Sequence, residues 1–258
     1  MVNEAILIPR VIPCLLLDED GMVKTVRFDA PTYLGDPINV VNLFNRFEVD
    51  EIVLLDIRAT VDDRIPDTGL IEELASECWV PLTYGGGIRD IEQARAILAA
   101  GVEKIVLGTA AADNPELVRD SVGEFGAQAV VVSVDVRAGR SGPYQVFVES
   151  GRRGLGIDPA GYARRAQELG AGEIFLNAID RDGTMAGYDT DLIREVAAAV
   201  SVPVIACGGA GERADLAEAI KVGGASAVAA GSIFVYQGRE RGVLINFPER
   251  GQLEALLA

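Results

Sequence analysis

Residues 80–87 read VPLTYGGG and residues 202–209 read VPVIACGG, so one motif occurs twice at a separation of 202 − 80 = 122 residues. The match extends upstream, because EIVLL at 51–55 and EIFLN at 173–177 have the same separation. It extends downstream to residues 101–108 and 224–231, which both begin and end with glycine. A repeat of about half the chain length indicates two similar units within one fold.

Short apolar runs recur along the chain on both sides of these motifs. They are rich in Val, Ile and Leu and do not alternate with polar residues, as is typical of parallel strands covered on both faces. The runs are residues 10–17, 51–57, 80–85, 104–107, 129–136, 173–179, 202–207 and 225–230. Amphipathic stretches with apolar positions three and four apart predict helices at 90–100, 158–169, 189–200 and 213–222, and residues 112–126 also read as a helix.

Eight strands that alternate with helices predict one closed (β/α)8 barrel, a TIM barrel, over residues 1–258, with half-barrels at about 1–125 and 126–258. No Pro- or Ser-rich linker separates the halves, which favours one domain over two. The alternative is an open doubly wound sheet. That fold gives no reason for a half-chain repeat and does not need eight strands.

The composition excludes several classes of function. With 23 Lys and Arg against 39 Asp and Glu, the net charge is −16, so binding to nucleic acid or to an anionic membrane is not expected. No apolar run reaches about 20 residues, and the first residues lack the basic start of a signal peptide, which predicts a cytoplasmic protein. The three cysteines have no CxxC spacing and there is no histidine, so we expect no metal site, no Ser-His-Asp triad and no cofactor.

Barrel active sites lie where the strands end, and several glycines follow the predicted strands. Without Cβ, their N–H groups can approach an anion closely. Gly208-Gly209 and Gly231-Ser232 follow the last two strands, and the repeat places Gly85–Gly87 and Gly108-Thr109 at the matching positions of the first half. Together they predict a ligand with two phosphates. The alternative is that each glycine only forms a tight turn.

Charged residues near the same strand ends are candidates for chemistry. Asp135 ends an apolar strand and is a candidate general acid or base, or else a helix cap or an ion-pair partner. Lys24 contacts a ligand or is a solvated loop charge, and Asp182 forms a turn before Gly183 or points at the substrate. Asp56 and Asp180 are expected to be structural.

The opposite end of the predicted barrel carries a second set of charges. Arg10, Glu51, Lys104 and Glu173 each stand at the start of a predicted strand. Such residues can form a ring of ion pairs that closes the bottom of the barrel. The alternative is that they are ordinary solvated charges, which contribute little to stability.

Seven motifs spread over nearly the whole chain resemble HisF, the cyclase subunit of imidazole glycerol phosphate synthase. They are RVIPCL at 10–15, GDP at 35–37, LDI at 55–57, YGGGI at 84–88, GAGEI at 170–174, IDRDGT at 179–184 and GYDT at 187–190. The last two are highly specific. The resemblance implies a lyase of histidine biosynthesis that converts a bis-phosphate ribonucleotide and ammonia into imidazole glycerol phosphate and aminoimidazole carboxamide ribotide.

The resemblance also assigns a partner and site residues. A HisH-type glutaminase would dock at the barrel bottom through Glu103 and release ammonia through a gate formed by Arg10, Glu51, Lys104 and Glu173. Asp135 and Lys24 would be catalytic. Phosphate and substrate would be bound by Gly87, Thr109, Asp182, Gly183, Gly209, Gly231 and Ser232.

Two positions depart from the HisF pattern. The family has a catalytic Asp at the end of the first strand where this chain has Leu16, and a phosphate-binding Asn where it has Gly108. Asp18 and Asp20 are nearby, but a slipped strand end would be needed to bring either to that place. Loss of a proton-transfer group typically costs about 10²–10⁴ in rate.

Residues 11–17 (VIPCLLL) and the segments 234–238 (FVYQG) and 242–248 (GVLINFP) resemble instead the HisF-like paralogues associated with glycosyl amidation, the WbuZ type. This likeness implies that the barrel passes ammonia to an ATP-dependent amidotransferase acting on an N-acetyl sugar. The first hypothesis is therefore an ammonia-transferring subunit for sugar amidation, and the second is the HisF cyclase. A related isomerase is a third possibility, but it also relies on two carboxylates, so Leu16 counts against it equally.

Overall fold

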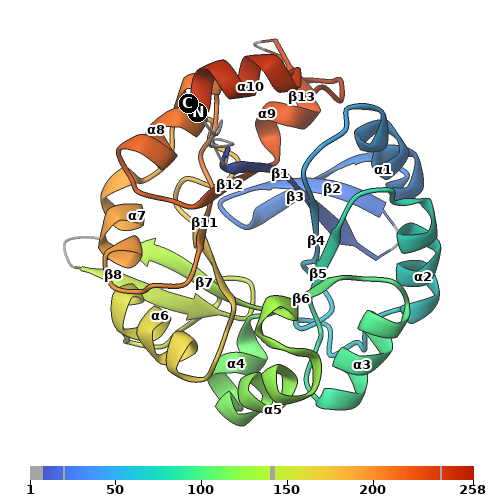
Figure 1. The fold of residues 1–258 in the computed structure, drawn as a ribbon. Coiled ribbons are helices and arrows are strands. Elements are labelled where there is room, and N and C mark those ends of the chain that lie inside the picture. The colour runs from blue at the N-terminus through green and yellow to red at the C-terminus, as the bar shows by residue number, and fades with distance from the viewer. Residues whose placement is uncertain (1–7, 20, 140–142, 239) are drawn as a thin grey trace, which may run out of the picture.

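The structure is a computed structural model, and it describes residues 8–19, 21–139, 143–238 and 240–258. Eight parallel strands close into a barrel in the order β10-β11-β12-β1-β4-β5-β6-β7, and β7 pairs with β10 to complete the circle (Figure 1). The strands are β1 (Arg10–Asp18), β4 (Ile52–Asp56), β5 (Leu82–Gly85), β6 (Lys104–Leu107), β7 (Val130–Ala138), β10 (Glu173–Ala178), β11 (Val204–Cys207) and β12 (Ala227–Ala230). The predicted (β/α)8 barrel is confirmed.

Helices surround the strands and bury their apolar sides against them (Figure 1). They are α1 (Pro37–Arg46), α2 (Thr68–Glu77), α3 (Ile91–Ala99), α4 (Thr109–Asp113), α5 (Pro115–Phe125), α6 (Pro159–Glu168), α7 (Thr190–Ala197), α8 (Arg213–Lys221), α9 (Ser232–Val235) and α10 (Arg250–Leu257). Aspartates cap several of them in the manner that the sequence favours. For example, the carboxylate of Asp158 accepts the N–H of Gly161 at the start of α6.

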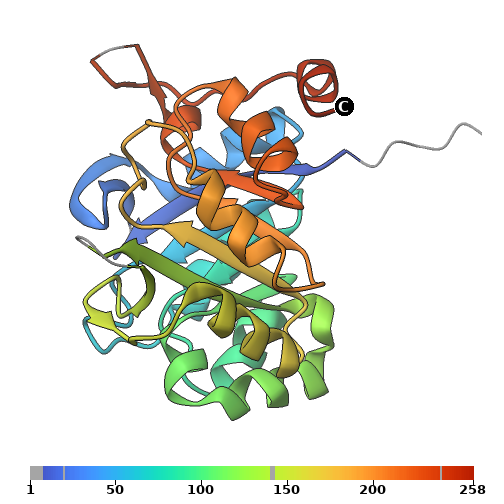
Figure 2. The same ribbon diagram turned by 90° about the vertical axis from the view of Figure 1, so that its left-hand side faces the viewer.

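Three antiparallel hairpins extend the barrel beyond its eight strands. They are formed by β2 (Gly21–Val26) with β3 (Asp29–Gly35), β8 (Tyr144–Val148) with β9 (Arg153–Gly154), and β13 (Tyr236–Gln237) with β14 (Gly242–Val243). Figure 2 shows them gathered on the left, the side toward which the barrel strands run. The hairpins therefore lie at the end of the barrel where the sequence predicts the site.

Two apolar clusters form the core. The larger lies between strands and helices, and the smaller lies inside the barrel and includes Leu16, Val53, Val131 and Phe175. Neighbouring strand residues point to opposite sides, so each strand contributes to both clusters. This explains why the strands read as continuously apolar.

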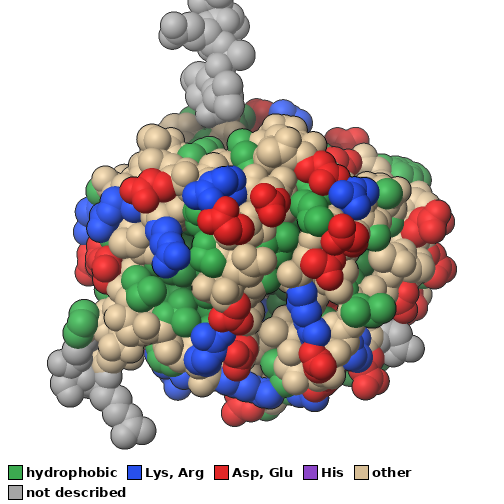
Figure 3. Space-filling model, turned by 90° about the horizontal axis from the view of Figure 1, so that it is seen from below, with side chains coloured by type: hydrophobic (Ala, Val, Ile, Leu, Met, Phe, Trp, Pro, Cys, Tyr) green, Lys and Arg blue, Asp and Glu red, His purple; other side chains and the backbone are tan. Residues whose placement is uncertain are grey.

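The outer face over α4 and α5 carries acidic, basic and apolar side chains in a mixed arrangement (Figure 3). No continuous basic patch is visible on the described part of this face. Within the described ranges, every helix is too short or too polar to cross a membrane.

Candidate functional site

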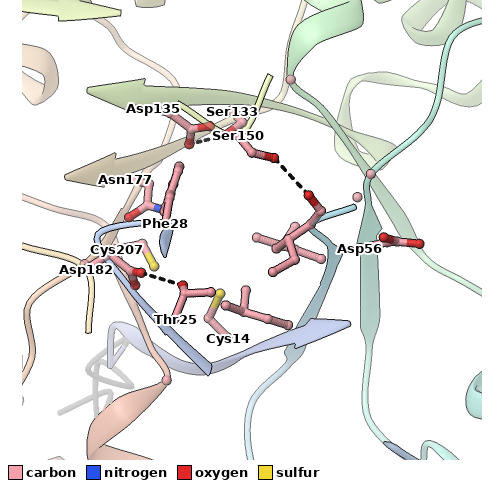
Figure 4. Close-up of a pocket in the computed structure, with 18 of the residues that line it drawn as sticks. Cys14, Thr25, Phe28, Asp56, Ser133, Asp135, Ser150, Asn177, Asp182 and Cys207 are labelled. Carbon is pink, nitrogen blue, oxygen red and sulfur yellow. Dashed lines mark hydrogen bonds between the residues drawn. The ribbon is translucent and has the colours of Figure 1, made fainter. Parts of the chain in front are cut away.

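A cavity of about 240 Å³ opens at the carboxyl ends of the barrel strands. Its wall is built from the ends of all eight strands and from the β2–β3 hairpin. Figure 4 shows labelled side chains such as Asp135, Asn177 and Asp182 around it, whereas the carboxylate of Asp56 points away from the centre. Most of the predicted site residues line it. They are Lys24, Gly87, Thr109, Asp135, Asp182, Gly183, Gly209, Gly231 and Ser232.

Asp135 is an acidic group on the wall of this cavity, in β7. Its carboxylate oxygen Oδ1 accepts a hydrogen bond from the Ser133 hydroxyl at 3.0 Å. Burial raises the pKa of Asp135 to about 7, and the nearby charge of Asp182 adds to this, although the Ser133 hydrogen bond opposes it. A carboxyl group with a pKa close to neutrality is suited to act as a general acid or base.

Lys24 is not the solvated loop charge that the sequence also allowed. It lies in β2, is only 7% exposed, and its Nζ is 3.0 Å from Oδ1 of Asp182. The Thr25 hydroxyl donates to the other oxygen of Asp182 at 3.1 Å. Burial lowers the pKa of Lys24, but the negative charge of Asp182 outweighs it and the pKa is raised overall. Lys24 and Asp182 therefore form a buried ion pair on the cavity wall.

Leu16 lies in the cavity wall where the first catalytic Asp of the HisF pattern is expected. It is 7% exposed and belongs to the apolar cluster inside the barrel. Asp18 lies at the end of β1 near Arg58, with 3.9 Å between Oδ1 and Nε, and is not among the cavity residues. Asp20 is outside the described residues. Within the described part of the chain, no carboxylate from the end of β1 replaces the missing one.

Two of the cavity glycines have backbone conformations that the tight-turn alternative requires. Gly183 has φ +70° and Gly209 has φ +117°, and a Cβ on either would lie 2.2 Å from a backbone carbonyl oxygen, of Thr25 and of Gly187 respectively. Close backbone packing therefore requires glycine there. Gly108 differs, because a Cβ there would meet only Ser133, at 3.8 Å. An asparagine would fit at this position without a steric clash.

The two hydroxyls predicted to bind phosphate occupy matching places at the starts of short helices. Thr109 begins α4 and its hydroxyl accepts the N–H of Glu149 at 3.0 Å, which ties it to the β8–β9 hairpin. Ser232 begins α9, and its buried hydroxyl has no hydrogen-bond partner among the described residues. A buried hydroxyl without a partner is costly unless a ligand or water satisfies it.

Several cavity residues were not predicted as site residues from the sequence, among them Cys14, Ser133, Asn177 and Cys207 on the barrel strands. Asn177 pairs directly with Asp135 across β10 and β7, and its buried Oδ1 has no partner within the described ranges. The neighbouring thiol of Cys14 and burial both raise the pKa of Cys207. A sequence signal exists for Cys14 and Ser133, because each lies two residues before a predicted strand-end position, Leu16 and Asp135 respectively.

At the other end of the barrel, the four predicted gate residues form a closed ring of ion pairs. Arg10 contacts both Glu51 and Glu173. Lys104 Nζ lies 3.1 Å from Glu51 and 3.0 Å from Glu173. Glu51 is 2% exposed and also accepts the Thr83 hydroxyl at 2.7 Å. The two positive and two negative charges therefore alternate around the barrel axis.

Three other predicted carboxylates have structural contacts. Glu103 is exposed, and one of its oxygens accepts the N–H of Leu82 at 2.7 Å. Asp56 accepts the N–H groups of Arg58 and Ala59 at 2.9 and 2.8 Å. Asp180 accepts the N–H of Ala138 at 2.8 Å. Within the described ranges, no three His, Cys, Asp or Glu side chains form a group that could hold a metal ion.

Comparison with known proteins finds a family and relatives whose names all refer to histidine biosynthesis or to imidazole glycerol phosphate synthase. Residues 10–240 match the model of a family described as "Histidine biosynthesis protein". A protein of Pseudomonas aeruginosa named "Putative imidazole glycerol phosphate synthase subunit hisF2" is 49% identical over 95% of this chain and 98% of that protein. The Leptospira interrogans protein named "Putative imidazole glycerol phosphate synthase subunit HisF" is 45% identical over 96% of this chain and 98% of that protein. "Imidazole glycerol phosphate synthase subunit HisF" of Alkaliphilus metalliredigens is 41% identical over 88% of this chain and 90% of that protein.

Proposed function

The chain belongs to the histidine biosynthesis protein family as a HisF-type barrel, and we propose that it is the ammonia-receiving subunit of a glutamine amidotransferase assembly. A HisH-type glutaminase docks at the bottom, and its ammonia passes the ring of Arg10, Glu51, Lys104 and Glu173 into the barrel. The observation that carries this proposal is the intact ring, which faces the opposite end from the ligand cavity.

The ammonia leaves the barrel for a partner amidotransferase that acts on an N-acetyl sugar. Leu16 supports this choice, because it places an apolar side chain where a cyclase needs its second carboxylate. One carboxyl group alone cannot act as both acid and base on opposite sides of a substrate. The cavity would then bind a phosphorylated ligand for regulation or docking, using the hydroxyls of Thr109 and Ser232.

A second candidate function is the cyclase reaction of imidazole glycerol phosphate synthase, and Asp135 favours it. Passing ammonia through the barrel does not require a carboxyl group whose pKa is raised to about 7, whereas proton transfer to a substrate does. In this reaction Asp135 would exchange a proton with the bound bis-phosphate ribonucleotide. The Lys24–Asp182 ion pair would supply the second proton-transfer group across the cavity.

Reconstitution of three purified components tests the proposal. We expect this chain, a HisH-type glutaminase and an N-acetyl sugar amidotransferase to amidate the sugar from glutamine and ATP, with product measured by mass spectrometry. Omission of this chain should abolish the glutamine-driven reaction but leave the reaction driven by ammonium chloride. Equal glutamine-driven rates with and without this chain would refute the proposed role in ammonia transfer.

A further inference from the structure

Trp79 is the only tryptophan of the chain, and it lies exposed between α2 and β5. Its side chain is 79% exposed, more than any other large hydrophobic side chain in the described ranges. Single exposed apolar residues are common at protein surfaces, so exposure by itself says little. The surroundings of Trp79 make this one different.

The backbone that presents Trp79 is held in place by a buried side chain. The Asn45 side-chain oxygen accepts the N–H of Trp79 at 3.0 Å, and its amide nitrogen donates to the carbonyl of Glu77 at 2.6 Å. Asn45 itself is only 6% exposed. The indole is therefore presented by a fixed loop, which lowers the entropy cost of binding through it.

A second aromatic residue, Phe47, lies close to Asn45 in the chain. Phe47 follows Asn45 by two residues and is 38% exposed, and its ring lies 6.4 Å from that of the buried Phe44. Phe47 also lines a shallow hollow with Pro9 and Phe247. Trp79 and Phe47 are therefore two exposed aromatic side chains close to Asn45, and together they are called the aromatic surface below.

This surface lies at the same end of the barrel as the ring of ion pairs. The segment after Trp79 runs into β5, where the hydroxyl of Thr83 donates to Glu51 of the ring. On the other side, the carboxylate of Asp50 accepts the N–H of Val11, next to Arg10 of the ring, at 3.1 Å. A protein that covers the ring at this end would also meet Trp79 and Phe47.

Carboxylates outnumber basic groups around the two aromatic residues, where the basic side chains are Arg46, which precedes Phe47, and Arg250, which lines the same hollow. Exposed acidic side chains near them in the chain or through hydrogen bonds are Glu48, Asp50, Glu77 and Glu103. An apolar centre with a charged rim is the usual arrangement of a protein interface, and tryptophan is enriched among the residues that dominate binding energy. Acidic rims select basic partner surfaces and speed their association at low salt.

We infer that Trp79 and Phe47 form the anchor by which the glutaminase subunit binds, with the indole in an apolar pocket that basic side chains border. This inference rests on the proposed function and adds the residues that carry the affinity. It also predicts the chemistry of the partner surface. Glu103 then belongs to the charged rim around Trp79 and Phe47.

The test uses the intact chain and a separately purified HisH-type glutaminase from the same organism. Because Trp79 is the only tryptophan, incorporation of 5-fluorotryptophan gives one fluorine resonance, which should shift when the glutaminase is added. Trp79→Ala should raise the Kd by at least about tenfold, as expected for truncation of an interface anchor. Tyr33→Ala is the matched control, because Tyr33 is 66% exposed on β3 at the other end of the barrel, and its Kd should stay within about twofold.

The outcomes separate the inference from the function on which it rests. If the wild-type chain does not bind the glutaminase, the proposed function and the inference both fall. If wild type binds and Trp79→Ala binds equally well with an unmoved fluorine signal, the anchor is wrong and the function stands. If the chain alone forms a dimer that Trp79→Ala dissociates in sedimentation velocity, the surface binds a second copy, which also overturns the inference.

Discussion

Replacement of Glu51 by alanine is expected to lower the free energy of unfolding by about 3–5 kcal/mol, because it leaves Arg10 and Lys104 with half of their negative partners in a buried ring. Glu51 is the most buried member and has the most contacts, including the hydroxyl of Thr83. Urea unfolding at neutral pH, followed by circular dichroism, gives the change directly.

The matched control for Glu51 is Glu124, which also forms a close ion pair but on the surface. Its carboxylate lies 2.7 Å from Arg95, and both side chains are exposed by more than a third. Solvent and salt screen such a pair, so Glu124→Ala should leave the urea midpoint nearly unchanged. Similar small changes in both variants would show that the four bottom charges are ordinary solvated residues.

Asp135→Asn is expected to stabilise the fold at pH 8 while it removes the proton-transfer group. The pKa of Asp135 is about 7 in the folded chain against 3.8 as the ordinary value, because burial disfavours the carboxylate. Well below pH 3.8 the group is protonated in both states and has no effect on stability. As the pH rises from about 4 to 7, the unfolded chain ionises first and wild type loses stability.

The difference between the two pKa values corresponds to at most about 4 kcal/mol at pH 8. Thermal unfolding should therefore show a higher midpoint for Asp135→Asn than for wild type at pH 8, with the two curves converging near pH 4. Asp56→Asn should have the opposite sign at pH 8, since Asp56 accepts backbone N–H groups of Arg58 and Ala59. A lower midpoint of Asp135→Asn at pH 8 would contradict the assigned environment of Asp135.

The sequence predicted the barrel well because its signal is local and repeated. Each of the eight runs is apolar on both faces, and the offset of 122 residues relates strands of the two halves, such as β5 and β11. The bottom ring was also predictable, since all four charges stand at or next to the first residue of a barrel strand. The repeat along the chain was sufficient to predict the barrel, and the position of the charges at strand starts was sufficient to predict the ring.

The cavity was less predictable because long-range pairing determines it. Lys24 is buried and paired with Asp182, which is 158 residues away in the chain. The β2–β3 hairpin that carries Lys24 has an exposed second strand without a strong apolar signal. Asn177 became a cavity residue because the barrel closes through β7 and β10, where it faces Asp135. The sequence alone did not show which inward-facing residues reach the cavity.

The central claim is that this barrel receives ammonia for another enzyme, because Leu16 removes one of the two carboxylates of a cyclase. Ammonia-dependent turnover of the HisF bis-phosphate ribonucleotide by the purified chain tests it most directly, beside Leu16→Asp and Asp135→Asn. We expect no measurable turnover by wild type and partial recovery in Leu16→Asp, since a proton-transfer group contributes about 10²–10⁴ in rate. Robust wild-type turnover that disappears in Asp135→Asn would contradict the claim and establish the chain as a cyclase.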